Sequence, residues 1–276
     1  MNKYLLLSFV LSFIIGQETE RIITIGGCVT ETVFTLNQGY KVVAVDVSST
    51  IPYKIKKLPQ VGYIRAISSE GILSMSPDYI LTTTDIGPPK VVEQLRKSGV
   101  KMEIFKSPHS VGEIIDLVDS ISIILDVEDE GLLTIDKIKK DCEIINRKIG
   151  DYEFSPKVVF FMNPTAGSLT AAGNNTRADY LIKFMGGNNI FKDEFSKYKK
   201  VTKEQIINFN PDIILVSSYS SSDQKSSSVF TDSNEFRSIA AVLNNRVIDI
   251  SMGEFLSFGP SLTSNVLELI EILNLD

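Results

Sequence analysis

Two stretches of the chain repeat one order of hydrophobic and polar positions. Residues 68–81 and residues 202–215 both follow the pattern hydroxyl-x-Glu-x-Ile-aliphatic-x-x-x-Pro-Asp-x-Ile-Leu. Each copy predicts a short helix that begins after Ser68 or Thr202, ends before a proline and leads into a buried strand. A match over so many positions in register predicts two halves of the same construction.

Short apolar runs elsewhere predict further strands that alternate with helices. The strand candidates are residues 21–25, 42–45, 157–162 and 247–250. This alternation predicts a parallel sheet in each half. Ligands of parallel α/β sheets bind beyond the carboxyl ends of the strands. The loops expected at those ends, and therefore along a cleft, include residues 48–63, 84–89 and 163–175.

Between the halves, residues 128–150 contain no proline, and their apolar positions recur every three or four residues. This spacing predicts one long amphipathic helix, which would form a stiff hinge. The predicted fold class is therefore α/β: two Rossmann-like lobes with parallel sheets, residues 21–127 and 155–276, joined by a single long α-helix. The ligand cleft is expected between the lobes.

The first residues are typical of an export signal. Lys3 precedes an apolar run over residues 4–15 that is too short to span a bilayer comfortably, and Gly16 then offers a small residue before polar chain. We predict a signal peptide at residues 1–16, cleaved near Gly16, and an exported, soluble mature protein. A buried first helix is the alternative.

Composition narrows the function. The net charge of −6 comes without any basic run, so no nucleic-acid surface is expected. The chain has one histidine, no Gly-x-Ser-x-Gly elbow and no phosphate-binding glycine loop. These features favour a binding protein over an enzyme. Cys28 and Cys142 lie far apart in the sequence and are expected to be unpaired.

Segment 61–66, Val-Gly-Tyr-Ile-Arg-Ala, falls in or beside a predicted cleft loop. If it is extended, Tyr63 and Arg65 point to the same side. A cation beside a phenol favours the phenolate, which is a hard ligand suited to ferric iron. Arg65 could instead pair with a carboxylate of the ligand. The alternative for Tyr63 is a surface side chain packed on a loop.

His109 precedes Ser110, which with Glu113 predicts a capping box at the start of the next helix. His109 would then lie at the mouth of the cleft, where it could be a second iron ligand. An exposed loop histidine is the plainer interpretation.

The chain resembles the periplasmic haem-binding proteins of bacterial ABC haem importers, and the resemblance covers almost the whole mature chain. The Gly62-Tyr63-x-Arg65 segment is its most specific part. The segments that carry it are residues 21–31, 59–71, 87–89, 171–173, 176–179, 186–189 and 258–260.

The resemblance implies a periplasmic protein, which we expect to be monomeric. It also implies that haem is the transported ligand, with Tyr63 as the axial ligand to iron and Arg65 as its support. It also implies that Glu70 and Glu204, one in each repeat, dock on arginines of a permease dimer in the inner membrane. Their plainer role is negative charge at a helix start, and the two roles are compatible.

The chain departs from the family at two places. Some relatives present a histidine where this chain has Asn174 and Asn175. These two residues are poor iron ligands, but we still expect both to contact the haem. The family also often has arginine at the position of Ser261. Haem would therefore be five-coordinate, or take a sixth ligand from His109, Tyr219 or water.

Two other functions stay open. The same scaffold could carry a corrinoid such as vitamin B12, or a ferric siderophore. An exported α/β enzyme is a third possibility, and turnover that depends on His109 or on a cleft carboxylate would favour it.

Overall fold

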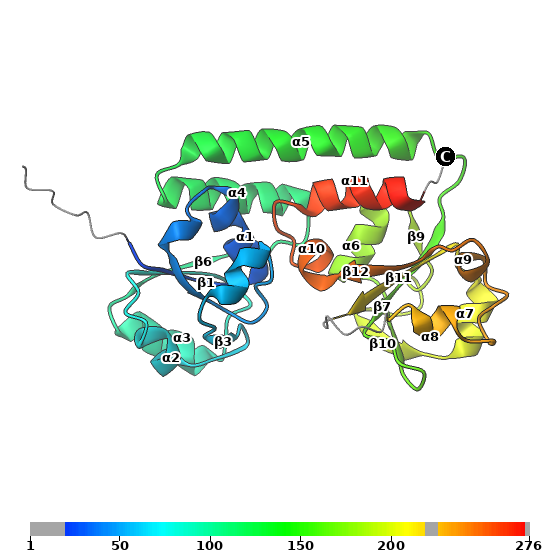
Figure 1. Cartoon of the computed structure of the whole chain (residues 1–276), viewed down its shortest axis with the longest axis horizontal. Coiled ribbons are helices and arrows are strands. Elements are labelled where there is room, and N and C mark those ends of the chain that lie inside the picture. The colour runs from blue at the N-terminus through cyan, green and yellow to red at the C-terminus, as the bar shows by residue number, and fades with distance from the viewer. Residues whose placement is uncertain (1–19, 219–225, 274–276) are drawn as a thin grey trace, which may run out of the picture.

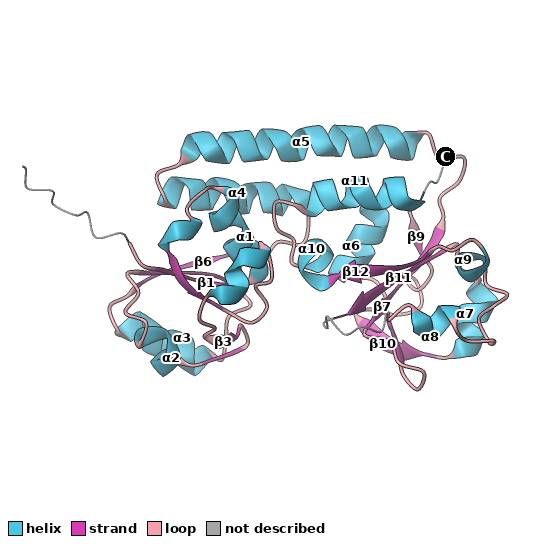
Figure 2. Cartoon of the chain, viewed as in Figure 1, coloured by secondary structure: helices cyan, strands magenta, loops and turns pink. Residues whose placement is uncertain are grey.

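Two α/β lobes lie side by side beneath a layer of long helices (Figure 1). The structure, a computed structural model, describes residues 20–218 and 226–273. The predicted signal peptide, residues 1–16, and Tyr219 lie outside the described residues. Figure 2 shows strands at the centre of each lobe and helices around them. The predicted fold class is confirmed: two α/β lobes are joined by one long helix, α5, at Glu128–Gly150.

In the first lobe, four described strands form a parallel sheet in the order β2-β1-β5-β6. Successive residues of β1 face opposite sides: Ile22 packs towards α1 and α4, whereas Ile23 and Ile25 pack towards α2 and α3. The sheet is thus buried on both faces, as a parallel sheet requires. The elements are β1 (Ile22–Ile25), α1 (Gly27–Thr35), η1 (Gly39–Lys41), β2 (Val42–Val45), η2 (Tyr53–Lys57), β3 (Gly62–Tyr63), β4 (Ala66–Ile67), α2 (Ser69–Leu73), β5 (Tyr79–Thr83), α3 (Pro89–Lys97), β6 (Lys101–Phe105) and α4 (Val111–Ile124).

In the second lobe, the described strands form a sheet in the order β10-β8-β7-β11-β12, with β9 also paired to β7. Along β7, Val158 and Phe160 face one hydrophobic cluster and Val159 and Phe161 the other. The elements are β7 (Lys157–Met162), β8 (Leu169–Ala172), α6 (Arg177–Phe184), β9 (Asn188–Asn189), β10 (Tyr198–Val201), α7 (Lys203–Phe209), β11 (Ile213–Ser218), α8 (Ser228–Thr231), α9 (Ala240–Leu243), β12 (Val247–Ser251), α10 (Met252–Leu256) and α11 (Leu262–Leu273).

The second sheet differs from the all-parallel prediction. Strand β8 runs antiparallel to β7 and to β10. The turn between β7 and β8 is tight, since Thr165 and Ser168 exchange main-chain hydrogen bonds of 3.0 Å in both directions. A connection this short cannot make the crossover that a parallel pair needs. Residues 163–175, expected as one cleft loop, therefore contain a strand.

The repeat holds at both helix starts. The Ser68 hydroxyl accepts the Gly71 N–H at 3.3 Å at the start of α2, and the Thr202 hydroxyl accepts the Gln205 N–H at 3.2 Å at the start of α7. These caps satisfy amide groups that have no partner inside a helix.

The Pro-Asp turn has the same role in each lobe. Asp78 accepts the main-chain N–H of Arg21 at 2.8 Å, and Asp212 accepts that of Lys157 at 2.8 Å. The two basic side chains donate to carbonyl oxygens near the ends of α2 and α7. Each aspartate thus ties the turn to the beginning of the neighbouring central strand, β1 or β7.

One continuous core crosses both lobes. Helix α4 of the first lobe and α11 of the second both pack along α5, and buried residues of all three belong to one hydrophobic cluster (Figure 1). Because the lobes share this core, the helix layer opposes large motions between them. Within the described residues, no helix combines the length and apolar character needed to cross a bilayer.

Candidate ligand-binding site

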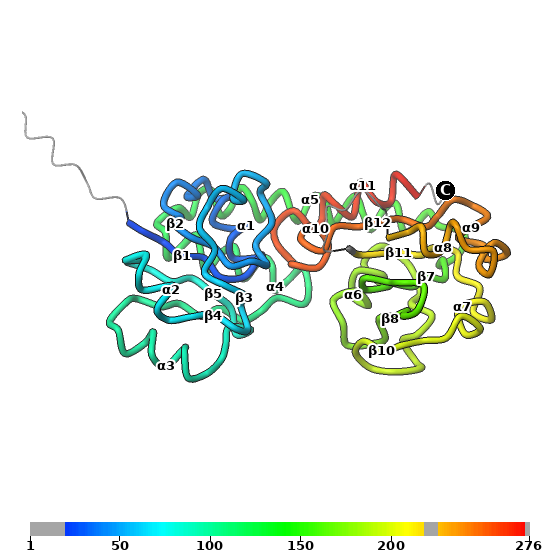
Figure 3. Tube along the Cα trace, turned by 60° about the horizontal axis from the view of Figure 1, so that its bottom comes forward, coloured from blue at the N-terminus to red at the C-terminus, as the bar shows by residue number. Residues whose placement is uncertain are grey.

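A cavity of about 700 Å³ lies between the lobes, within the usual size of small-molecule sites. In Figure 3, the β3–β4 hairpin lies on the side of the first lobe that faces the second, and α6 lies on the opposing side. The residues from the first lobe include Gly27, Cys28, Ser48, Thr50, Tyr63, Arg65, Asp85, Ser107 and His109, and those from the second include Met162, Asn175, Arg177, Lys197, Tyr198, Met252 and Ser257.

The first wall is the β3–β4 hairpin, whose turn is Ile64 and Arg65. Ile64 is buried in the lobe, and its carbonyl oxygen accepts the Gly87 N–H at 2.8 Å. Its neighbours Tyr63 and Arg65 are exposed and line the cavity, with Tyr63 48% exposed. The alternation arises because one buried side chain anchors the turn and leaves both flanking side chains at the cleft.

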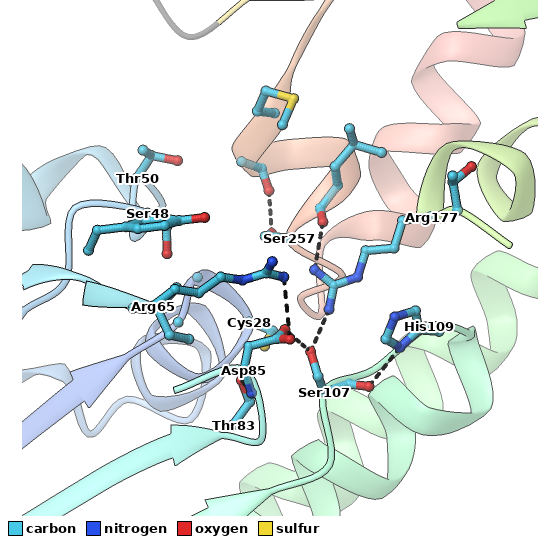
Figure 4. A pocket seen from close by; sticks show the side chains of 18 of the residues that line it. Cys28, Ser48, Thr50, Arg65, Thr83, Asp85, Ser107, His109, Arg177 and Ser257 are labelled. Atoms are coloured by element: carbon cyan, nitrogen blue, oxygen red, sulfur yellow. Dashed lines mark hydrogen bonds and ion pairs between the residues drawn. The ribbon is translucent and has the colours of Figure 1, made fainter. Parts of the chain in front are cut away.

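A polar chain crosses the floor of the cavity. The Arg65 guanidinium lies 3.5 Å from Asp85, which accepts the Ser107 hydroxyl at 2.6 Å, and Ser107 accepts from Arg177 at 2.8 Å. Figure 4 shows Arg65 and Arg177 approaching this Asp85–Ser107 pair from opposite sides. The chain links the hairpin of the first lobe to α6 of the second.

Arg177 is a residue that the sequence analysis did not single out. Besides Ser107, it donates to the carbonyl oxygens of Pro108 at 3.0 Å and Leu256 at 3.1 Å, and it lies over the ring of Phe258. Each of its three guanidinium nitrogens thus donates one hydrogen bond that joins α6 to segments far away in the sequence. We infer a structural role for Arg177 at the base of the cleft.

A second tie joins the lobes behind the cavity. Glu31, buried in α1, accepts the main-chain N–H of Ser261 at 2.6 Å. Burial raises the pKa of Glu31 above its usual range. Ser261, which stands where the resembling family often has arginine, therefore meets the first lobe through its main chain.

The second wall is a rim formed by residues 173–175 and 195–197. Lys197 donates its main-chain N–H to Asn174 at 2.9 Å, and its carbonyl oxygen accepts from Gly173 at 2.8 Å. Asn175 donates to the Ser196 hydroxyl at 3.2 Å. Asn175 and Lys197 line the cavity, whereas Asn174 does not: its side-chain amide donates to the carbonyl oxygen of Lys192 at 2.7 Å. We expected Asn174 to contact the ligand, but in the structure its side chain bonds to the main chain and does not line the cavity.

His109 is exposed at the edge of the cavity, in the loop before α4. Its Nδ1 lies 2.9 Å from the Ser107 carbonyl oxygen, and its main-chain N–H donates to Glu113 at 2.7 Å. A carbonyl only accepts, so Nδ1 carries a proton in this contact, and in the corresponding tautomer of the uncharged ring the lone pair is on Nε2. The Lys106 ammonium, followed by the His109 amide, lowers the pKa of Glu113 and holds this loop in place.

The sulfur-containing side chains that line the cavity are those of Cys28, Met162 and Met252. Burial raises the pKa of Cys28 to about 12, so its thiol stays neutral and is a weak ligand. Cys28 and Cys142 are both free. Within the described residues, no group of three or more His, Cys, Asp or Glu side chains could hold a metal ion.

Glu70 and Glu204 lie outside the cavity. Both are exposed in the first turn of a helix, α2 or α7, and Figure 1 shows both helices on the side of their lobe away from α5. A hydrogen bond with its own main-chain amide, with a smaller contribution from the Thr202 side chain, lowers the pKa of Glu204. Each lobe therefore presents one carboxylate at an equivalent position of the repeat.

Two rigidly connected lobes around a preformed cavity, with polar groups on both walls, define a binding protein for a small ligand. Residues 22–252 match the periplasmic binding protein family, and the chain belongs to this family. Members of the family deliver ligands to ABC permeases. The chain is accordingly a substrate-binding protein and not an enzyme.

Relatives divide by the ligand they bind. The chain is 30% identical to the periplasmic heme-binding protein BhuT, solved with two hemes, with a TM-score of 0.82 over 92% of this chain and 97% of that one. It is 27% identical to the heme-binding protein RhuT from Roseiflexus sp. RS-1, with a TM-score of 0.81 over 92% and 99%. It is 26% identical to the vitamin B12-binding protein of Vibrio parahaemolyticus, over 81% of each chain.

Proposed function

We propose that this protein captures haem in the cleft between its lobes and delivers it to the permease of an ABC importer. The observation that carries the proposal is the β3–β4 hairpin, which presents Tyr63 and Arg65 together at the cavity. Tyr63 is half-exposed there and therefore accessible to a ligand.

A single tyrosine can hold iron only if the bound molecule itself supplies most of the atoms that coordinate the metal. In haem, the porphyrin supplies four nitrogens, and tyrosine is an established axial ligand. The described residues contain no cluster able to hold a bare ion, which agrees with this assignment. In the proposal, Arg65 supports the phenolate of Tyr63 or pairs with a carboxylate of the haem.

The sixth coordination position has candidate ligands in His109, Tyr219 and water. His109 offers its Nε2 lone pair at the cavity edge, since Nδ1 is held by the Ser107 carbonyl oxygen. Asn175 lines the opposite wall and would contact the ring by hydrogen bonding. Tyr219 follows β11 but lies outside the described residues.

We assign docking on the permease to Glu70 and Glu204. Each is an exposed carboxylate at the start of a helix, and the internal repeat places one on each lobe. Two such groups suit a permease dimer that carries arginines in matching positions. We also assign the mature protein to the periplasm, as a monomer, with residues 1–16 acting as the export signal.

The test is titration of the mature protein with haemin, followed by absorbance. We expect a spectrum of tyrosinate-bound ferric haem, and we expect Tyr63→Phe to abolish its phenolate-to-iron band and to raise Kd by at least about tenfold. Tyr53→Phe is the matched control, because Tyr53 is 77% exposed and does not line the cavity. An unchanged spectrum in Tyr63→Phe would contradict the assignment of Tyr63 as the axial ligand to iron.

Vitamin B12 is the second candidate, because curated relatives at 25–26% identity carry the name vitamin B12-binding protein. Cyanocobalamin should therefore be titrated in parallel. The proposal expects weak or no binding, since cobalamin arrives with its axial positions filled and leaves no role for the Tyr63 phenol. Tight cyanocobalamin binding without a haemin spectrum would reject haem as the ligand and favour vitamin B12.

A further inference from the structure

The cavity contains three strongly cationic side chains, Arg65, Arg177 and Lys197. They differ in how many partners each has within the protein. Arg177 donates to two carbonyl oxygens and one hydroxyl, so three of its five N–H donors are already bound within the protein. Arg65 meets only a partly exposed carboxylate, Asp85, at the long distance of 3.5 Å. None of the ion pairs among the described residues uses Lys197.

The backbone of Lys197 is held while its side chain is left exposed. Both main-chain groups of Lys197 are bonded to the Gly173–Asn174 segment, at 2.8 and 2.9 Å. Its φ of 67° lies in the left-handed region, where the conformational energy of glycine or asparagine is lower than that of lysine. The hydrogen bonds on both sides hold this conformation, and they leave the Lys197 side chain exposed at the cavity.

The rim that carries Lys197 is closely packed. A Cβ on Gly173 would lie 2.0 Å from the Phe195 carbonyl oxygen, so the two segments approach as closely as a glycine allows. Strand β10 then begins at Tyr198 and pairs with β8. The antiparallel strands of the second lobe thereby fix Lys197 across the cavity from the hairpin that carries Arg65.

We propose that Arg65 and Lys197 bind the two carboxylates on one edge of the ligand, each from its own lobe. The site would then select a macrocycle with two ionised side chains, such as haem, over one whose side chains are neutral amides, such as a corrinoid. This inference rests on the proposed function and assigns Lys197 as a specificity-determining residue. Charge-assisted bonds to carboxylates supply the discrimination.

The test compares haemin with haemin dimethyl ester, which keeps the iron and the ring but has no ionised carboxylate. Lys197→Asn removes the charge with a residue that tolerates the left-handed backbone, and Lys200→Asn is the matched control on the same segment, outside the cavity. We expect Lys197→Asn to raise Kd for haemin about tenfold, with the iron spectrum unchanged, and to change Kd for the ester less than about twofold. Lys197→Arg should restore haemin binding.

The outcomes separate the two proposals. If the wild-type protein forms the tyrosinate-haem spectrum but Lys197→Asn binds haemin as tightly as wild type, only the role of Lys197 is overturned. Equal losses for haemin and ester would also overturn it, because they would show a structural effect on the rim. If the wild-type protein does not bind haemin, the proposed function fails and this inference fails with it.

Discussion

The two lobes share their core and differ at the cleft. In both, a capped helix, a Pro-Asp turn and a central strand recur, and Asp78 and Asp212 each accept a main-chain amide at the beginning of that strand at 2.8 Å. The cleft-facing parts do not recur: the first lobe inserts the β3–β4 hairpin, and the second inserts the antiparallel strands β8 and β10. The repeated parts thus stabilise the lobes, whereas the non-repeated insertions carry Tyr63 and Arg65 in the first lobe and border Asn175 and Lys197 in the second.

The largest effect is expected at the insertion of the second lobe. Gly173→Ala would place a Cβ 2.0 Å from the Phe195 carbonyl oxygen, which itself accepts the Asn174 N–H at 3.0 Å. Because main chain meets main chain, we expect a loss of about 3 kcal/mol in the free energy of unfolding. Denaturation with urea measures it.

The same variant should weaken haemin binding, since the rim that carries Asn175 and Lys197 must shift. Gly167→Ala is the control, because no atom lies within 4 Å of the position of its added Cβ. Equal stability of the two variants would show that the rim is not as closely packed as the structure indicates.

A smaller effect tests the equivalence of the repeated parts. Asp78→Ala and Asp212→Ala each remove a charge-assisted hydrogen bond at the beginning of a central strand, from Arg21 just before β1 and from Lys157 in β7. Each variant should cost about 1–2 kcal/mol in the free energy of unfolding. Since the two contacts have the same length and the lobes share one core, we expect similar losses in a single unfolding transition. A substantial loss in one lobe with none in the other would contradict the equivalence.

The sequence predicted the parts whose signal is local or repeated. The apolar period of residues 128–150 gave α5, and the two Pro-Asp repeats gave the helix–turn–strand units. Arg177 was missed because two of its acceptors, the carbonyl oxygens of Pro108 and Leu256, are 69 and 79 residues away and leave no pattern in the sequence.

The antiparallel strands were missed for a different reason. Strand β10 is only four residues long, Tyr-Lys-Lys-Val, and two of them are exposed lysines, so hydrophobic alternation is weak. The neighbouring Lys197 has no motif around it, and only the backbone conformation distinguishes it from other surface lysines. Segment 61–66 stood out in the sequence because its tyrosine and arginine match a family pattern.

The smallest effect is expected for Lys197→Gly, a variant that tests whether Lys197 contributes to stability or to haemin binding. Lys197→Gly relieves a left-handed backbone that costs an L-residue about 1–2 kcal/mol, but it gives up about 0.5–1 kcal/mol through the greater freedom of the unfolded chain. We expect a net gain of about 0.5 kcal/mol, equivalent to a rise in Tm of about 1–2 °C, measured by thermal unfolding. Lys199→Gly, within β10, should instead lower Tm, since glycine weakens a strand. A protein that becomes more stable while binding haemin less tightly would show that the lysine is retained for its charge, whereas a less stable Lys197→Gly variant would show that the side chain supports the rim.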